Sequence, residues 1–544
     1  MIRDETRRRP RDATHHPTAA ENRKCLQDHI VFPLISTYFQ LSARRPVPPR
    51  PVLSLFPRLS QRKPLVLCGS APKKQARPKK PRPILAAGLV ASISLCWLAG
   101  ACGQVDLWLT DPDKSVLFQK QNPSLSFSNP TNPHPVIAVD ETQSFQTIDG
   151  FGCCLTGGSA MLLLRMSAPA RAALLKELFA DDAANIGLSY LRLSLGASDL
   201  NDHVFSYDDL PPGQTDPGMA KFSLDPDRAD VIPVLREILA INPELKLLAS
   251  PWSPPPWMKT NHDSRGGSLK PEFYPAYAKY FVRYILGLRA EGIRIDAITV
   301  QNEPLHPGNN PSLFMPAPEQ AAFIKLHLGP AFRAAAIDTR IIVYDHNADR
   351  PDYPLAILND PAARQYVDGS AFHLYAGAIE TLTQVHDAYP DKNLYFTEQW
   401  VGAPGHLKGD LDWHVKHLVI GASRNWCRTV LEWNLAADPN HDPHTDRGGC
   451  DRCLGALTLA GDQVTRNPAY YILAHAAKFV RPGSVRIASA GPQTLPNVAF
   501  KTPGARSVLI VLNDSQAPQT FNVRYRRHLA TSALNPGAVG TYVW

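Results

Sequence analysis

Beyond residue 102 the chain has no excess of positive charge, although its formal net charge is +8. Residues 1–102 carry 19 Lys and Arg against 5 Asp and Glu, which leaves 38 against 44 for residues 103–544. Proteins that bind nucleic acid neutralise phosphates with clustered Lys and Arg. The slightly acidic balance of the larger part therefore argues against a nucleic-acid partner.

A long apolar run at residues 83–102 follows the basic stretch 73–82. This order, with small residues at the end of the run, is typical of an export signal. We predict a signal peptide over residues 81–102, and a transmembrane anchor is the alternative because the run approaches spanning length. The ending "LAGAC" also resembles a lipoprotein cleavage box, in which Cys102 would carry a lipid and attach the protein to a membrane.

Residues 1–80 form a basic, Pro/Arg-rich extension without hydrophobic periodicity. We expect this extension to be disordered or to lie ahead of the true start of the protein. The signal behind it predicts an exported protein that is periplasmic, secreted or lipid-anchored at the cell envelope.

Cysteine is scarce, with nine residues in 544. In an exported protein the cysteines beyond the leader are expected to form disulfides or to be buried thiols rather than redox catalysts. The segment "HDPHTDRGGCDRC" (441–453) also has ligand types that suit zinc. A metal site, a disulfide and free side chains all remain open there. The segment contains Cys450 and Cys453, and the other cysteines beyond the leader are Cys153, Cys154 and Cys427, whose disulfide pattern also stays open.

Strand and helix patterns alternate over residues 149–477, after a Pro/Ser/Asn-rich stretch at 103–132 that we predict to be a linker. Eight such units indicate an α/β fold of the (β/α)8 TIM-barrel type. A doubly wound sheet is disfavoured because it usually has fewer strands and often a Gly-rich phosphate loop, which "DGFG" is not. The candidate strands are 147–156, 188–196, 245–252, 295–303, 339–347, 368–376, 393–400 and 429–436.

Both flanks of the predicted barrel change character. Residues 133–148 and 478–544 contain short alternating runs broken by turn residues, such as "NVAFKTPGARSVLIVLNDS". This pattern is typical of antiparallel β-structure. We therefore predict a side β-sandwich domain that is formed from both flanks of the barrel.

Polar residues stand where the predicted strands end, as in "QNE", "YDHN", "FHLY", "TEQW" and "EWN". In a (β/α)8 barrel these ends form the active site. Two of them carry a glutamate, Glu303 and Glu398. Cleavage of a glycosidic bond needs one carboxyl group to protonate the leaving oxygen and a second to act at the anomeric carbon. The aromatic residues nearby suit the faces of sugar rings.

The motifs "LRLSLGASD", "LLASPWSPPPWMKT", "TVQNEP", "FHLY", "TEQW" and "WNL", in this order, resemble glycoside hydrolase family 30, the glucosylceramidase family. The resemblance covers roughly residues 135–544. It implies a (β/α)8 barrel with a side β-sandwich and retaining hydrolysis of β-glycosides without a metal or organic cofactor. Glucosylceramidase-type β-glucosidase activity is the first expectation.

By position, the resemblance makes Glu303 the acid/base and Glu398 the nucleophile. It further implies that Arg192 and Tyr375 keep Glu398 ionised while Glu303 stays protonated. The substrate-binding residues that it implies are Asn302 at the sugar 2-hydroxyl, Asp199, Trp252 and Trp433 at other hydroxyls, Tyr375 and His373 beside the nucleophile, and Arg192 as a supporting cation.

Two alternatives remain open. The enzyme could be an endo-β-1,6-glucanase or another β-glycanase of the same family, since the family contains these. The chain could instead be a catalytically inactive surface lipoprotein that binds carbohydrate, but the presence of both Glu303 and Glu398 argues against that because binding alone needs neither.

Overall fold

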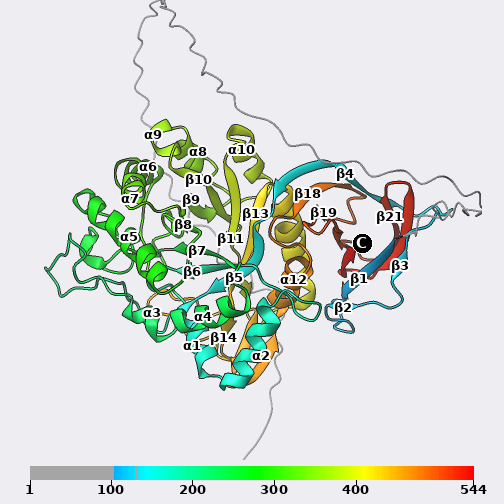
Figure 1. Cartoon of the computed structure of the whole chain (residues 1–544), viewed down its shortest axis with the longest axis horizontal. Helices are drawn as coiled ribbons and strands as arrows, with labels where there is room; N and C mark the ends of the chain where they lie inside the picture. Colours follow the sequence, from blue (N-terminus) through cyan, green and yellow to red (C-terminus); the bar gives the residue numbers. More distant parts are fainter. Residues whose placement is uncertain (1–102, 130) are drawn as a thin grey trace, which may run out of the picture. The chain divides into compact units, whose positions relative to one another are not determined.

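The computed structural model describes residues 103–129 and 131–544, which fold into a closed barrel and a large second sheet (Figure 1). The predicted extension at 1–80 and the predicted signal at 81–102, with Cys102, lie outside the described residues.

Eight strands close the barrel, and every neighbouring pair is parallel. Each of them falls within or beside a range that the sequence predicts as a strand, and the (β/α)8 prediction is confirmed. The strands are β5 (Gly150–Leu155), β6 (Tyr190–Ser194), β7 (Lys246–Ser250), β8 (Ala297–Thr299), β9 (Arg340–Asn347), β10 (Val367–His373), β11 (Asn393–Glu398) and β13 (Cys427–Asn434).

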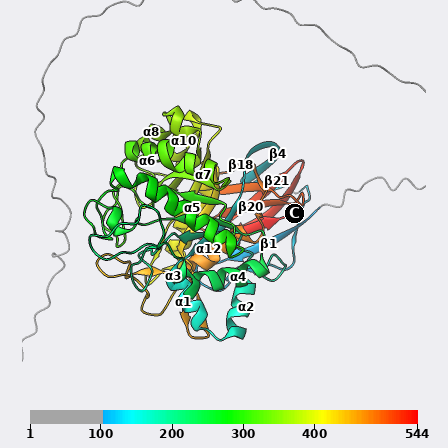
Figure 2. The same ribbon diagram turned by 60° about the vertical axis from the view of Figure 1, so that its left-hand side comes forward.

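Helices surround these strands, as Figure 2 shows from a second direction. In α5 (Tyr274–Ala290), Tyr277, Phe281 and Tyr284 recur at helical spacing and are buried, whereas Lys279 and Arg283 face solvent. This is the amphipathic pattern of a helix packed on one side. The other helices are α1 (Gly157–Arg165), α2 (Ala168–Phe179), α3 (Asp225–Ala229), α4 (Val231–Ile241), α6 (Ala317–Phe323), α7 (Gly329–Ala334), α8 (Asp352–Leu358), α9 (Pro361–Arg364), α10 (Thr381–Ala388), α11 (Leu407–His414) and α12 (Pro468–Ala477), with 3₁₀ turns η1 (Pro256–Met258) and η2 (Pro271–Phe273) and π-helical turns η3 (Ile324–Leu328) and η4 (Val415–Ala422).

The inside of the barrel is closed by one ring of apolar and aromatic side chains, which we call the apolar ring. Seven strands contribute one buried residue each, and together these residues form a cluster of their own. A barrel interior filled in this way is a packed core and not a pore. The members are Tyr190, Leu248, Ala297, Ile342, Ala371, Tyr395 and Leu431.

The second sheet combines strands from both flanks of the barrel, as predicted. It folds over a separate apolar core that includes Ile137, Leu509 and Phe521. A bridge between Ser128, just after β3, and Leu529 of β22 adds a further link across this sheet. Its strands are β1 (Gln104–Thr110), β2 (Gln119–Lys120), β3 (Leu125–Ser126), β4 (Val136–Thr147), β18 (Val485–Ala490), β19 (Asn497–Lys501), β20 (Ser507–Leu512), β21 (Gln519–Tyr525), β22 (His528–Leu534) and β23 (Val539–Val543).

The predicted linker at 103–132 is wrong over its first part. Residues 104–110 form β1, which pairs with β23 over five residues. Val105 and Leu107 alternate with more exposed residues and enter the core of the second sheet. The Pro/Ser/Asn-rich composition of the following residues concealed this short alternating strand.

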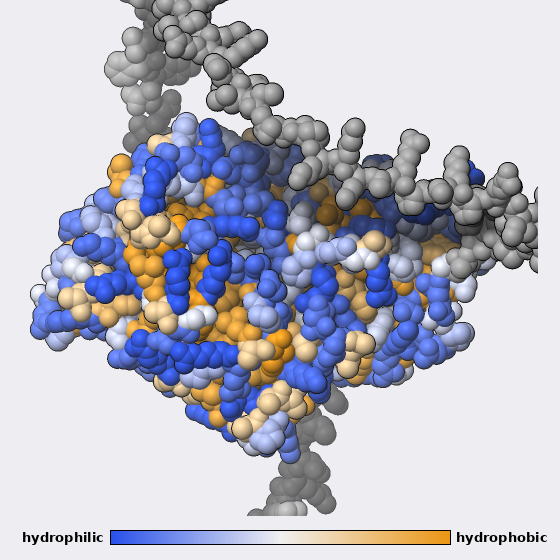
Figure 3. All heavy atoms as spheres, viewed as in Figure 1, coloured by the Kyte–Doolittle hydropathy of each residue, from blue (hydrophilic) through white to orange (hydrophobic). Residues whose placement is uncertain are grey.

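The surface in Figure 3 is mostly hydrophilic, with apolar patches on the barrel side. Within the described part of the chain, every helix is too short or too polar to cross a lipid bilayer. Short strands beyond the barrel complete the structure: β12 (Val401–Gly402) pairs with β15 (Cys453–Leu454), and β14 (Ala436–Ala437), β16 (Leu457–Ala460) and β17 (Gln463–Arg466) form a small sheet.

Candidate active site

The mouth of the barrel begins two residues after the apolar ring. Because side chains alternate across a strand, the second residue after a ring member faces inward again on every contributing strand except β9. These residues are polar or aromatic, and a hydrogen bond from Arg192 Nε to Ser250 Oγ joins two of them across strands. Six members follow the ring by two positions: Arg192, Ser250, Thr299, His373, Thr397 and Trp433.

Glu398 and Glu303 lie together at this mouth. Glu398 is the last residue of β11, and Glu303 follows the end of β8 by four residues. Both are buried, with 6% and 8% of their surface exposed. One oxygen of each glutamate and one ring nitrogen of His373 all lie within 4.8 Å of one another. The structure thus brings the predicted catalytic pair into direct proximity.

The backbone at this point is strained. Glu303 has a φ of 44°, and Tyr344 and Asp345 on the neighbouring strand have φ values of 72° and 68°. A residue other than glycine in the left-handed region costs on the order of 1–3 kcal/mol. The Glu303 amide donates a hydrogen bond to the Asp345 carbonyl at 3.0 Å and links the strained residues. Strain of this kind is typical of functional sites.

Each glutamate has its own set of partners. Glu398 accepts hydrogen bonds from Arg192 Nη1 at 2.5 Å and from the Tyr375 hydroxyl at 2.9 Å. Glu303 Oε1 lies 3.2 Å from His373 Nδ1 and 3.9 Å from His346 Nε2.

The resulting protonation balance differs from the one expected from the sequence. Burial raises the pKa of Glu398 against the opposing charges of His373 and Arg192. Burial also acts to raise the pKa of Glu303, but the hydrogen bond and charge of His373 outweigh it and the pKa is lowered. The sequence predicts an ionised Glu398 from its neighbours Arg192 and Tyr375, but it gives no sign of a cation beside Glu303.

His373 explains that difference. Burial opposes its charged form, but Glu398, Asp345 and Glu303 together raise the pKa of His373 to about 9. At neutral pH the proton of this pair therefore rests on His373, whose Nδ1 lies 3.2 Å from Glu303 Oε1. The predicted role of Glu303 requires that proton.

The predicted sugar contacts gather around the pair. Asn302 Oδ1 accepts a hydrogen bond from Arg192 Nη2 at 2.6 Å. Asp199 Oδ1 and Trp252 Nε1 are buried and have no hydrogen-bond partner among the described residues. Buried polar atoms are normally satisfied, so atoms of this kind at a binding site are suited to ligand hydroxyls. Burial and the charges of Glu398 and Glu303 raise the pKa of Asp199 to about 8, which favours its neutral, hydrogen-donating form.

The two predicted tryptophans stack on each other, with ring centroids 5.3 Å apart. The Arg192 guanidinium lies 4.9 Å from the centre of the Trp252 ring. Trp252 is almost fully buried against these two groups, whereas Trp433 borders the cavity. Tyr375 is the most exposed of the predicted residues, at 39%.

Sequence reasoning missed Asp345, a fully buried carboxylate at the centre of the mouth. It accepts hydrogen bonds from Arg192 at 2.8 Å, Thr299 at 2.6 Å and Thr397 at 2.6 Å. The polar strand end "YDHN" was the available signal. Other missed residues border the cavity: His306, Asn309, His346, Asn347 and Trp400.

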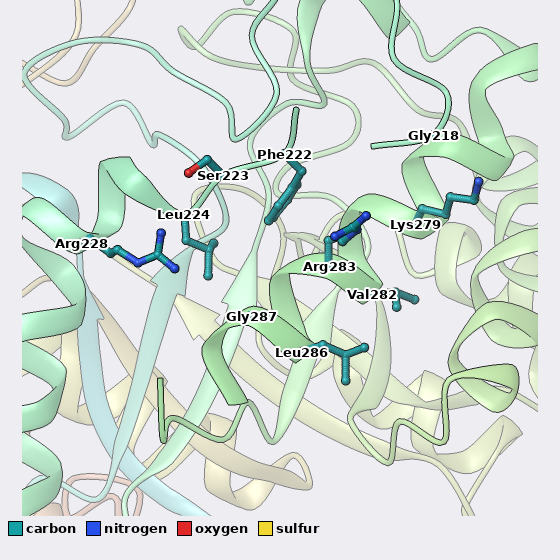
Figure 4. A pocket seen from close by; sticks show the side chains of 10 residues that line it. All are labelled: Gly218, Phe222, Ser223, Leu224, Arg228, Lys279, Val282, Arg283, Leu286 and Gly287. Carbon is teal, nitrogen blue, oxygen red and sulfur yellow. The ribbon is translucent and has the colours of Figure 1, made fainter. Parts of the chain in front are cut away.

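A cavity of about 320 Å³ opens onto Glu303 and Glu398. A larger cavity of about 620 Å³ lies between residues 218–224 and α5, as Figure 4 shows. Arg228, Lys279 and Arg283 line it, and it contains no carboxyl group. Only the smaller of these two cavities can supply the paired carboxyl groups that glycosidic cleavage needs.

The segment 441–453 contains a disulfide, Cys450–Cys453, which borders the smaller cavity. This bond consumes both thiols, so a zinc site that uses them is excluded. Thr445 Oγ1 donates to the Asn310 carbonyl, and Arg447 pairs with Asp263 at 3.2 Å. These contacts fasten the segment to the loops after β7 and β8. The remaining described cysteines, Cys153, Cys154 and Cys427, are buried thiols, as one of the two expectations had it.

Comparison with protein families assigns the barrel and the C-terminal part of the second sheet. Residues 148–480 match the glycosyl hydrolase family 30 TIM-barrel domain, and residues 483–542 match the glycosyl hydrolase family 30 β-sandwich domain. The division between the two matches follows α12, at the end of the barrel.

Relatives and solved structures agree with this match. The endo-1,6-β-D-glucanase neg1 of Aspergillus fumigatus is 35% identical over 69% of this chain and 80% of its own length. The lysosomal acid glucosylceramidase of Mus musculus is 30% identical over 77% of this chain and 85% of its own length. The solved structure of the endo-β1,6-glucanase BT3312 is 34% identical with a TM-score of 0.76, and the match covers 81% of this chain and 99% of that one.

Proposed function

The chain belongs to glycosyl hydrolase family 30, and within this family we propose that it is a retaining endo-β-1,6-glucanase. It is a glycoside hydrolase that acts on β-linked glycans. The proposal of the 1,6-linkage rests on the relatives: the endo-1,6-β-D-glucanases of Aspergillus fumigatus and Neurospora crassa are 35% and 36% identical to it. The mouse glucosylceramidase is 30% identical. This order favours the glucanase alternative over the glucosylceramidase activity that was expected first.

The observation that carries the proposed mechanism is the short distance between the carboxyl groups. An oxygen of Glu303 lies within 4.8 Å of an oxygen of Glu398. Retaining enzymes separate their two carboxyl groups by about 5–5.5 Å, whereas inverting enzymes need about 6.5–9.5 Å to admit a water molecule. The geometry therefore supports a double displacement.

In the first step a Glu398 oxygen bonds to the anomeric carbon while the glycosidic C–O bond breaks. Glu303 passes to the departing oxygen the proton that His373, at 3.2 Å, holds at rest, which leaves Glu303 a carboxylate and His373 neutral. In the second step Glu303 takes a proton from water, the water oxygen bonds to the anomeric carbon, and the bond to Glu398 breaks. Two inversions retain the β-configuration.

A substrate panel tests the proposal. The purified protein is incubated with linear β-1,6-glucan, β-1,3-glucan, glucosylceramide and an aryl β-glucoside. We expect β-1,6-glucan to be cleaved fastest and to give a series of oligosaccharides before glucose accumulates. Faster cleavage of glucosylceramide would favour the second candidate, a glucosylceramidase. No cleavage of any member would favour the non-catalytic carbohydrate-binding alternative.

We also propose that the enzyme is exported, because the order of basic and apolar residues at 73–102 is that of an export signal. Intact-mass measurement of the native protein tests this. We expect a mass without residues 1–102, or, after lipoprotein-type cleavage, a mass without residues 1–101 that includes Cys102 and its acyl chains. A native protein that retains residues 1–80 would contradict the proposal.

A further inference from the structure

Asp345 occupies a position that the proposed mechanism does not use. It is fully buried, and its two carboxylate oxygens contact different groups. Oδ2 accepts hydrogen bonds from Arg192 Nη2 at 2.8 Å, and Oδ1 lies 3.2 Å from His373 Nε2. One carboxylate therefore contacts both buried cations of the mouth.

Each of these cations faces one catalytic glutamate. Arg192 uses a second nitrogen, Nη1, to contact Glu398 at 2.5 Å. His373 uses its other ring nitrogen, Nδ1, to face Glu303 at 3.2 Å. The result is a chain of alternating charges, Glu398–Arg192–Asp345–His373–Glu303, with Asp345 at its centre.

Local structure holds Asp345 in this place. The register between β9 and β10 shifts so that Tyr344 pairs with Ala371 and His346 pairs with Phe372, which leaves Asp345 as an extra residue. This is a β-bulge, a feature that redirects a side chain. The strained φ of 68° at Asp345 accompanies it. Three hydroxyl groups, from Ser250, Thr299 and Thr397, donate to the carboxylate.

We propose that Asp345 is a positioning residue for the reaction: it holds Arg192 against Glu398 and His373 against Glu303, and its charge sets the pH range in which both glutamates are correctly protonated. The burial of an uncompensated carboxylate is costly, and here two cations and three hydroxyls compensate it. The proposal rests on the proposed hydrolase function for its kinetic part. Its electrostatic part concerns the resting site alone.

The sign of the effect follows from Coulomb's law. A buried negative charge favours the protonated form of every titrating group nearby, so its removal lowers their pKa values. Within the chain of alternating charges, Glu303, Glu398, Arg192 and His373 titrate or carry charge. The titratable groups outside it that face its members are Tyr375, His346, His306, Asp199 and Cys154. None of the others lies between Arg192 and His373 as Asp345 does.

The test is Asp345→Asn, which keeps the size of the side chain and removes its charge. We expect kcat/KM to fall about 10²-fold, as for a displacement of catalytic groups by about 1 Å. Both limbs of the pH–activity profile should move to lower pH by about one unit or more. If Asp345 acted only through packing and hydrogen bonds and not through its charge, Asp345→Asn would lower activity without shifting the pH–activity profile.

Asp149→Asn is the matched control. Asp149 also pairs with two arginines, Arg428 at 2.7 Å and Arg340 at 3.3 Å, but it precedes β5 at the opposite end of the strands. It should leave the pH profile unchanged. An unshifted profile in Asp345→Asn, or an equal shift in both variants, would overturn the proposal.

A second measurement does not depend on activity. The imidazole of His373 is titrated by NMR in histidine-labelled protein, in the parent and in Asp345→Asn. The pKa of His373 should fall from about 9 toward the ordinary value of about 6.5. If no β-glycoside is cleaved but this shift occurs, the hydrolase function fails and the electrostatic role of Asp345 holds. If His373 titrates alike in both proteins, the role of Asp345 is wrong.

Discussion

The apolar ring and the mouth are built from the same strands, two residues apart, and their chemistry is opposite. Tyr190 of the ring precedes Arg192 of the mouth, and Ala371 precedes His373. The ring excludes water and contributes to stability. The mouth contains the cations Arg192 and His373 and the carboxyl groups of Glu303, Glu398, Asp345 and Asp199, and the burial of a charged group costs free energy unless it is paired. The ring thus contributes mainly to stability and the mouth mainly to activity. A substitution in the ring should therefore lower stability more than activity, and one in the mouth should do the reverse.

The largest expected effect is that of Glu398→Gln, which removes the proposed nucleophile. We expect kcat to fall by ~10⁴-fold or more, because residues of a covalent mechanism have effects of this size. Azide, supplied as an external nucleophile, should restore part of the turnover of an aryl β-glucoside and give an α-configured product. Rate measurements and NMR of the product check this.

The control for this variant is Glu432→Gln. Glu432 is equally buried, but it faces the helix layer, where its carboxylate lies 2.8 Å from His414 Nδ1. It should lower thermal stability and leave kcat/KM nearly unchanged. Equal losses of activity in both variants would show that the mouth and its surroundings are not separable.

A smaller effect is expected for Glu303→Gln, which removes general acid catalysis, a contribution of about 10²–10⁴-fold. The loss should depend on the leaving group. It should be near the upper end for β-1,6-glucan, whose leaving alcohol needs a proton, and much smaller in the first step for a dinitrophenyl glucoside, whose leaving group does not. The two substrates are compared by kcat/KM. An equal loss on both would contradict the acid/base assignment of Glu303.

Next in size is a change in the ring. Leu431→Ala should cost about 2–5 kcal/mol of unfolding free energy, as for a large-to-small change in a core. Leu431 is fully buried, and two positions further along β13 lies Trp433 of the mouth. At 25 °C we expect kcat/KM to stay within about twofold of the parent value. Denaturant unfolding and steady-state kinetics measure the two quantities, and a loss of activity without a loss of stability would contradict the division.

Much of this comparison is visible in the sequence. Alternation within "YLRLS" and "LEWN" places Arg192 and Trp433 two residues after apolar neighbours, and the motifs around Glu303 and Glu398 predict the proposed catalytic pair. The two-residue spacing between ring and mouth does not hold on β9. Two residues after Ile342 comes Tyr344, which packs in the outer core, and the inward position falls to Asp345 because of the bulge. No local pattern in the sequence reveals that register shift.

Other errors have the same origin in long-range contacts. The alternation of Val105 and Leu107 was too short to stand out from the Pro/Ser/Asn-rich residues behind it, and β1 gains its stability from a partner strand at the far end of the chain. The proton on His373 depends on carboxylates that the fold brings from other parts of the chain, among them Glu303, which follows β8. Burial and cross-strand charge, which decide the pKa values, are properties of the folded chain.

The smallest expected effect concerns the rim of the mouth, where the Cys450–Cys453 disulfide borders the cavity. Cys453 pairs with Gly402, two residues after Trp400, which borders the same cavity. Replacement of both cysteines by serine should cost at most about 2 kcal/mol, because the closed loop is very short.

The contacts of Thr445 and Arg447 with the neighbouring loops are independent of the disulfide and should keep the segment in place. We therefore expect KM for β-1,6-glucan to rise a few-fold, since the polymer must pass the rim, and kcat for an aryl β-glucoside to stay unchanged. Kinetics on both substrates, with and without a reducing agent, measure this. If KM for the aryl glucoside rises as much as KM for the polymer, the disulfide also shapes the part of the mouth that binds the aryl glucoside. The prediction that it acts only at the rim would then be wrong.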